Sequence, residues 1–217
     1  MTDGAYAAIF DLDGVLTSTS ARHEESWRDA AARFGFPVTN ESLMATRSVP
    51  RATSLAALLA QAGVELDQAT RDAVMAFKNV RYKELIAGLK PTDAFPGARE
   101  ALMRCRDLGM RIGVASASMN SREVLERLEL LDLVQHVADP REAAPKPSAE
   151  IYGISCAALS AFPGNAICIE DGALMIANLR AEGMYTVGVG DTGLGAHEHV
   201  RAIADWDAAA TLSRLSG

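Results

Sequence analysis

The sequence predicts an α/β protein built on a doubly wound parallel sheet, with a separate helical domain inserted after the first strand. Short apolar runs alternate with helical stretches, which is typical of βαβ units with helices on both faces of the sheet. About 100 residues separate the first two apolar runs, whereas a crossover connection takes only about a dozen or more. That long interval has a helical pattern of its own, which predicts an inserted domain.

Five short apolar runs are predicted to be buried strands. They cover Ala5–Phe10, Arg111–Ala115, Leu133–Ala138, Ala166–Ile169 and Thr186–Val189. Sheets of this type bring their chemistry to the carboxyl ends of the strands, so functional side chains are expected just after these runs. The glycine-rich stretch Gly188–Gly195, which follows the last run, lacks the lysine of a P-loop and is predicted to be a flexible loop.

The interval between the first two runs contains three predicted helices. Each ends at a glycine, the usual stop signal, and these glycines are Gly35, Gly63 and Gly88. Trp27, in the apolar stripe of the first helix, is predicted to be a core residue. The insert is expected to form a helical cap domain of residues 17–90, while residues 1–16 and 91–217 form the core domain.

The composition is that of an ordinary globular protein. Of 217 residues, 49% are hydrophobic and 23% charged, which excludes a mainly disordered chain. The net charge of −7 argues against broad binding to nucleic acid or to an anionic membrane. No apolar run approaches the ~20 residues that cross a bilayer, and the first residues lack a signal-peptide pattern. Three cysteines without disulfide or zinc spacing are predicted to be buried. We expect a cytoplasmic protein that acts as a monomer.

The strongest motif is Asp11-Leu12-Asp13-Gly14, at the end of the first apolar run. Side chains two apart in an extended chain share one face, so both carboxylates are expected above the sheet. Gly14 lets the chain turn sharply after them. One aspartate can attack as a nucleophile while the other moves a proton. Taken alone, the motif also fits an acidic strand end that caps the next helix.

Three further motifs fall where other strands of the same sheet are expected to end. Ser116–Asn120 opens a predicted helix, where hydroxyls and free N–H groups suit a phosphoryl oxygen or simply cap the helix. Lys146 lies between two prolines, which present its ammonium from a stiff turn. Glu170 and Asp171 follow the fourth run. Together with the first motif they form an oxygen-rich cluster, which suits Mg²⁺ better than zinc.

The order of these motifs resembles the haloacid dehalogenase superfamily over essentially the whole chain. The dehalogenases proper lack the second aspartate of the first motif. Its presence here, as Asp13, indicates the branch of the superfamily that transfers phosphoryl groups. Within that branch the chain resembles the β-phosphoglucomutase family, whose fold is a Rossmann-like sheet with an inserted helical cap. The matches beyond the core motifs are His23, Trp27, Val49, Arg51, Lys78, Asn79, Thr92–Gly97, Ser116–Asn120 and Ala138–Pro140.

The resemblance implies phosphoryl transfer through an aspartyl phosphate. It makes Asp11 the nucleophile and Asp13 the general acid/base. It gives Ser116 and Lys146 the task of holding the phosphoryl group in transit. The groups implied for one Mg²⁺ per subunit are Asp11, the carbonyl of Asp13, Asp171, and Glu170 at the metal or immediately behind it. The residues implied for the sugar phosphate are His23, Val49, Arg51, Lys78, Ala117, Ser118, Met119 and Asn120, with backbone help from Ser48.

The implied reaction interconverts β-glucose 1-phosphate and glucose 6-phosphate, with glucose 1,6-bisphosphate as the priming intermediate. A small-molecule phosphatase on the same scaffold is the alternative, because its core residues would be the same with water replacing the sugar hydroxyl. Only His23, Arg51 and Asn120 favour the mutase. A signalling receiver domain also phosphorylates an aspartate, but such domains are much shorter and have no helical insert.

The chain departs from the family pattern at three positions. Gly172 stands where serine or threonine is usual, Met175 where glycine is usual, and Met119 where a basic residue is frequent. The first two bear on the rigidity of the loop beside the metal, and so on Mg²⁺ affinity. The third removes a charge near the distal phosphate.

Overall fold

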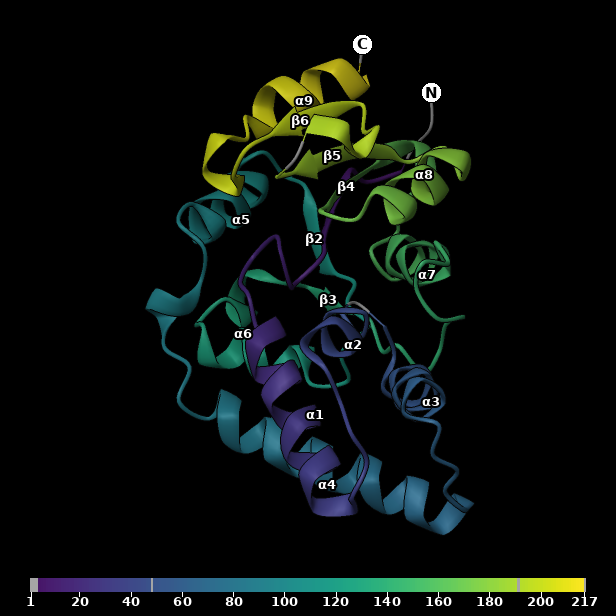
Figure 1. Ribbon diagram of the computed structural model, residues 1–217. Helices are drawn as coiled ribbons and strands as arrows, with labels where there is room; N and C mark the ends of the chain where they lie inside the picture. The colour runs from purple at the N-terminus through teal and green to yellow at the C-terminus, as the bar shows by residue number, and fades with distance from the viewer. Residues whose placement is uncertain (1–3, 48, 191, 217) are drawn as a thin grey trace. The chain divides into compact units, whose positions relative to one another are not determined.

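The computed structural model describes residues 4–47, 49–190 and 192–216, and the chain divides into two compact units (Figure 1). One unit combines Met1–Ser18 with Lys90–Gly217 and contains the sheet, and we call it the sheet unit. The other unit, Thr19–Leu89, contains only helices and is called the helical unit. The chain therefore leaves the sheet unit after the first strand and returns to it about 70 residues later.

A six-stranded sheet with the order β3-β2-β1-β4-β5-β6 forms the centre of the sheet unit, and every neighbouring pair is parallel. The strands are β1 (Ala7–Phe10), β2 (Arg111–Val114), β3 (His136–Val137), β4 (Ala166–Glu170), β5 (Tyr185–Val189) and β6 (Glu198–Val200). This is the predicted doubly wound topology. Its strand order reverses between β1 and β4, and the crevice at such a reversal is where ligands bind in sheets of this kind.

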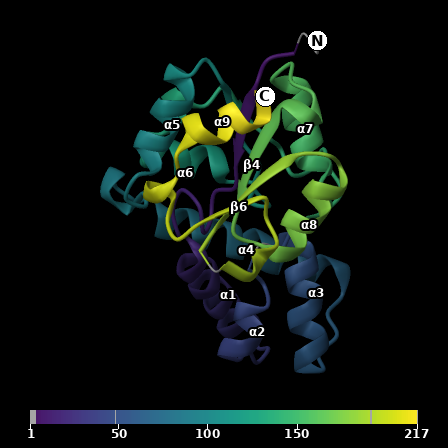
Figure 2. The same cartoon turned by 90° about the horizontal axis from the view of Figure 1, so that it is seen from above.

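Helices cover both faces of the sheet, as the apolar runs predicted (Figure 2). They are α5 (Ala98–Asp107), α6 (Ser121–Arg127), α7 (Glu150–Ala158), α8 (Ala173–Ala181) and α9 (Ala208–Ser216). Side chains alternate along a strand, so β1 contributes to two cores. Ala7 and Ile9 lie in one cluster with residues of α7 and α8, whereas Phe10 meets the ring of Trp206 at 5.8 Å. Burial on both faces explains why β1 and β4 are uniformly apolar up to their ends.

The helical unit is built from α1 (Ser20–Phe34), α2 (Asn40–Met44), α3 (Arg51–Ala62) and α4 (Gln68–Ile86). Trp27 is almost fully buried in its core, as predicted. Gly35 and Gly63 end α1 and α3 in the left-handed conformation, which glycine adopts without steric cost. The short helix α2 was not predicted. It has a capping box at Thr39 and Ser42, but only five residues, too few for a periodic stripe.

Three sequence predictions for the sheet need correction. The first run forms a strand only from Ala7, and the third run contributes only His136–Val137, because Leu131–Leu133 forms a 3₁₀ turn. The last predicted strand is followed by another, β6, at the sheet edge. Its three residues are half-buried, so they show no apolar run.

The three cysteines are buried, as predicted. Among the described residues, no helix is both long enough and apolar enough to cross a membrane.

Candidate functional site

The acidic motifs lie where the strand order reverses. Asp11 directly follows β1, and Glu170 is the last residue of β4. The two strands are neighbours, and the backbone N–H of Asp11 continues their ladder by donating to the carbonyl of Ile169 at 2.9 Å. The parallel register therefore brings two motifs about 160 residues apart in sequence to one edge of the sheet.

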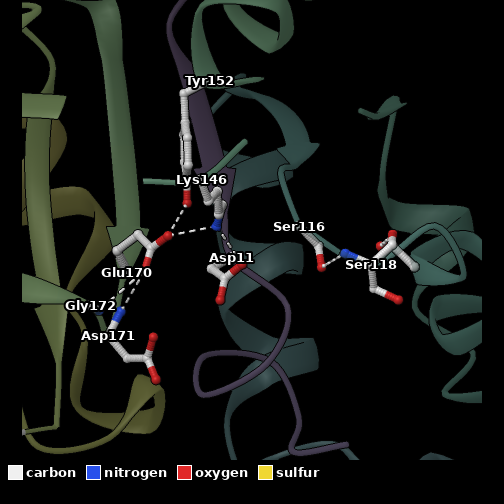
Figure 3. A network of polar contacts seen from close by, with 9 residues as sticks. Asp11, Ser116, Ser118, Lys146, Tyr152, Glu170, Asp171 and Gly172 are labelled. Carbon is white, nitrogen blue, oxygen red and sulfur yellow. Dashed lines mark hydrogen bonds and ion pairs between the residues drawn. The ribbon is translucent and has the colours of Figure 1, made fainter. Parts of the chain in front are cut away.

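Lys146 joins these two carboxylates (Figure 3). Its ammonium donates to Asp11 Oδ1 at 2.8 Å and to Glu170 Oε1 at 2.7 Å. The side chains of Lys146 and Asp11 are each only 6% exposed, and that of Glu170 is 3% exposed. A buried charge is tolerated when it is paired and hydrogen-bonded, and this lysine has two anionic partners.

Tyr152 also contacts this ion-pair cluster, and the sequence analysis missed it. Its hydroxyl donates to Glu170 Oε1 at 2.9 Å, and the Lys146 ammonium lies 5.1 Å from its ring centroid. The second oxygen of Glu170 accepts the backbone N–H groups of Asp171 at 3.0 Å and Gly172 at 3.2 Å. The signal available in the sequence was weak, because an apolar-flanked tyrosine on a helix usually belongs to the core.

Burial dominates the electrostatics of the cluster. It raises the pKa of Asp11 well above its ordinary value against the opposing charge of Lys146, and the negative charge of Glu170 raises that pKa further. Burial alone would lower the pKa of Lys146, but the charges of Asp11 and Glu170 outweigh it and raise that pKa. The lysine is therefore held as an ammonium. A second cation close to Asp11 would stabilise the charged form of its carboxyl group.

The site has the ligands for such a cation. Asp11, Glu170 and Asp171 each offer a carboxylate oxygen within 4.8 Å of the others, and oxygen ligands are those that Mg²⁺ prefers. Burial and the charge of Glu170 raise the pKa of Asp171 to about 6. Gly14 makes room for this carboxylate: its φ is +96°, and a Cβ there would lie 1.9 Å from Asp171 Oδ2. The donor set thus fits a hard divalent cation.

The other predicted residues of the sheet unit lie at the same edge. Asp13 forms a backbone bridge to Thr17, and its charge helps to raise the pKa of Asp171. Ser116 follows β2, and its Oγ accepts the N–H of Ser118 at 3.1 Å, while Ser118 Oγ accepts that of Asn120 at 3.2 Å. These bonds fold the loop after β2 into a tight turn ahead of α6.

The three positions at which the chain departs from the family pattern have different surroundings. Met119 is 51% exposed on the loop after β2, and Met175, a residue of α8, is buried in the core. Gly172 donates to Glu170, and a Cβ at this glycine would meet only ordinary contacts of 3.5 Å or more.

His23 and Lys78 lie together in the helical unit. The Lys78 ammonium, on a residue 2% exposed, is 2.7 Å from His23 Nδ1 and 4.8 Å from the ring centroid of Tyr82, on which the imidazole stacks. An ammonium has only donors, so Nδ1 accepts and the imidazole proton lies on Nε2. Burial, Lys78 and Arg51 lower the pKa of His23 well below its ordinary value.

Arg51 is the first residue of α3 and donates to Asn79 Oδ1 at 2.7 Å. Since Asn79 directly follows Lys78 on α4, the helical unit gathers two cations beside His23. Val49 uses its N–H within a turn, donating to Thr46 at 3.3 Å, and Ser48 lies outside the described residues. Ala117 lies half-buried in the loop after β2.

Comparisons with known proteins agree with this fold. A model of the haloacid dehalogenase-like hydrolases matches residues 7–181. The β-phosphoglucomutase of Bacillus subtilis is 33% identical over 204 residues, covering 92% of this chain and 90% of that protein. A phosphorylated carbohydrates phosphatase of Thermotoga maritima is 30% identical, covering 76% of each chain.

The fold comparison gives the same result. The solved structure of β-phosphoglucomutase from Clostridium difficile has a TM-score of 0.90 at 28% identity, and the match covers 98% of this chain and 97% of that one. The resemblance inferred from the motifs is confirmed, and this chain belongs to the haloacid dehalogenase-like hydrolase family of enzymes.

Proposed function

We propose that this protein transfers a phosphoryl group through an aspartyl phosphate on Asp11, and that its reaction is the interconversion of β-glucose 1-phosphate and glucose 6-phosphate. The observation that carries the proposal is the buried pair of Asp11 and Lys146, 2.8 Å apart, beside the carboxylate of Asp171. It supports the proposal because a carboxylate oxygen, which can act as a nucleophile, lies beside a fixed positive charge at the reversal of strand order.

The chain's own groups account for the chemistry. A carboxylate oxygen of Asp11 forms the new bond to phosphorus while the bond to the leaving oxygen breaks, and Asp13 gives that oxygen its proton. Lys146 and Ser116 hold the equatorial oxygens, because phosphoryl transfer depends mainly on positioning and charge neutralisation. Asp11, Asp171 and the carbonyl of Asp13 would hold one Mg²⁺, which supplies further positive charge when bound.

The helical unit supports a mutase that handles a second phosphate. Arg51 offers a planar fork of donors suited to a phosphate, and Lys78 is a second cation on the neighbouring helix. In this proposal Arg51, Ser118 and Asn120 bind the phosphate that does not react, and Lys78 supports the sugar. His23 orients Asp13. Glucose 1,6-bisphosphate would prime the enzyme by loading Asp11.

Hydrolysis is the second candidate. The relatives that are named phosphatases, including that of Thermotoga maritima and hexitol phosphatase B of Escherichia coli, favour it. In that reaction water, rather than a sugar hydroxyl, takes the phosphoryl group from Asp11.

One assay decides between the candidates. The protein is incubated with β-glucose 1-phosphate, Mg²⁺ and a trace of glucose 1,6-bisphosphate, and products are followed by ³¹P NMR. We expect glucose 6-phosphate, formed only when Mg²⁺ is present, and no product from Asp11→Asn. Inorganic phosphate and glucose as the main products would support the phosphatase. Undiminished activity of Asp11→Asn would refute the aspartyl phosphate in either reaction.

A further inference from the structure

Tyr152 is a buried polar residue that the roles above leave unused. It lies on α7, its residue is 0% exposed, and it belongs to the apolar cluster formed with β1, β4 and α8. A phenol hydroxyl in such surroundings needs a hydrogen-bond partner. Its partner is the carboxylate of Glu170, at 2.9 Å, rather than a backbone carbonyl of the core.

The hydrogen bond from Tyr152 holds a carboxylate whose two oxygens together accept four hydrogen bonds. Glu170 Oε1 accepts from Tyr152 and Lys146, and Oε2 accepts from the N–H groups of Asp171 and Gly172 (Figure 3). Each carboxylate oxygen has two acceptor positions, so these four donors occupy the set. In this arrangement Glu170 is held by Lys146 and by the backbone after β4, at the edge of the cation site.

Tyr152 also touches the other member of the ion pair. The Lys146 ammonium lies 5.1 Å from its ring centroid, within the range of a cation–π contact. Lys146 is therefore fixed from three directions: by Asp11, by Glu170 and by the ring face of Tyr152. The hydroxyl of the same ring prevents Glu170 from rotating away.

We propose that Tyr152 is a positioning residue, whose hydroxyl holds Glu170 so that the Lys146 ammonium is fixed beside Asp11. The proposal relies on the proposed function only for its consequence in catalysis. A loosened ammonium would stabilise the transferring phosphoryl group less, without changing how the sugar is bound.

Tyr152→Phe tests the hydroxyl alone, since it keeps the ring and the volume of the core. With β-glucose 1-phosphate, or with acetyl phosphate if the protein is a phosphatase, we expect kcat to fall about tenfold, equivalent to about 1.4 kcal/mol of the barrier. KM should stay within about twofold. In a Glu170→Gln background the same substitution should cost less than about twofold, because the hydroxyl acts through that carboxylate.

A second measurement needs no turnover. Hydrogen exchange of the Lys146 ammonium, followed by ¹⁵N NMR and assigned through Lys146→Arg, should be several times faster in Tyr152→Phe than in the wild type. Tyr185→Phe is the matched control. It removes a hydroxyl from the first residue of β5, whereas Glu170 pairs with Gly188 near the other end of that strand, and the substitution should change neither kcat nor the exchange rate.

The outcomes separate the two proposals. Unchanged ammonium exchange in Tyr152→Phe would overturn the positioning role, and so would a loss of thermal stability with kcat intact. If the wild type transfers no phosphoryl group from any substrate, the proposed function fails, and the exchange measurement still decides whether Tyr152 holds the cluster.

Discussion

Replacing Gly14 by alanine adds one methyl group, which should lower the activity strongly and the stability only slightly. Its φ of +96° is a backbone conformation that glycine adopts readily and other residues do not. In Gly14→Ala the new Cβ would lie 1.9 Å from Oδ2 and 2.5 Å from Cγ of Asp171. Ordinary contact begins at 3.4 Å, so the carboxylate must retreat by about 3.4 − 1.9 = 1.5 Å. The end of a side chain can do this without moving the fold.

Two effects of this substitution can be estimated independently. The backbone strain should lower the free energy of unfolding by about 1–2 kcal/mol. A reacting group displaced by about 1 Å can cost on the order of a hundredfold in rate. We therefore expect Mg²⁺-dependent turnover to fall about a hundredfold, with a higher Mg²⁺ concentration needed for half-maximal rate.

Gly109→Ala is the matched control, because it isolates the strain. Gly109 has φ +75°, lies in the sheet unit, and an added Cβ there would meet nothing within 4 Å. Both variants should lose similar stability in urea unfolding, and only Gly14→Ala should lose activity. Equal activity in the two variants, each assayed well below its melting temperature, would refute the assignment of Asp171 to the cation site.

Three further outcomes are expected. Asp11→Asn should lower turnover roughly a thousandfold or more, since no other group replaces the nucleophile, and rapid-quench labelling with ³²P should find no phosphoenzyme. Arg51→Ala should lower mutase turnover at least about tenfold more than hydrolysis of p-nitrophenyl phosphate; an equal loss in both assays would argue against a second phosphate at Arg51. Because burial and the charge of Lys78 lower the pKa of His23 in the folded chain, the unfolded chain takes up a proton there more readily as the pH falls from about 7 to 5, so the free energy of unfolding should fall over that range. Urea titrations should show that His23→Gln lacks this part of the loss, which begins below the unfolded pKa of about 6.5.

The sheet and its acidic site could be predicted because their signals are local. Buried parallel strands are short apolar runs, and Asp11, Lys146 and Asp171 stand directly after such runs or within a proline-flanked turn. Strand β6 and helix α2 could not be predicted on that basis. Both are short, and β6 lies half-buried at the sheet edge, so neither produces a periodic pattern.

The polar role of Tyr152 could not be predicted from the sequence. Nothing in the residues around it indicates a polar role, and its partner Glu170 is 18 positions away on another element. The contact exists only because α7 packs against the sheet at β1, the strand next to β4. Similarly, the burial of Lys78 against His23 and Tyr82 results from how α1 and α4 lie together in the helical unit, and a mixed-charge helix gives no hint of it.

The amino-acid sequence by itself determined the α/β class, the carboxyl ends of the main strands to within a residue, and the residue types that follow them, because each depends on a few consecutive positions. Only the tertiary structure decided which of those side chains are paired and which are saturated. The carboxylate of Glu170 is a possible metal ligand by composition, and the four donors that hold it come from α7, the lysine turn and the residues after β4. Hydrogen bonds depend on angles and distances of a few ångströms, and these are fixed only when distant segments fold together.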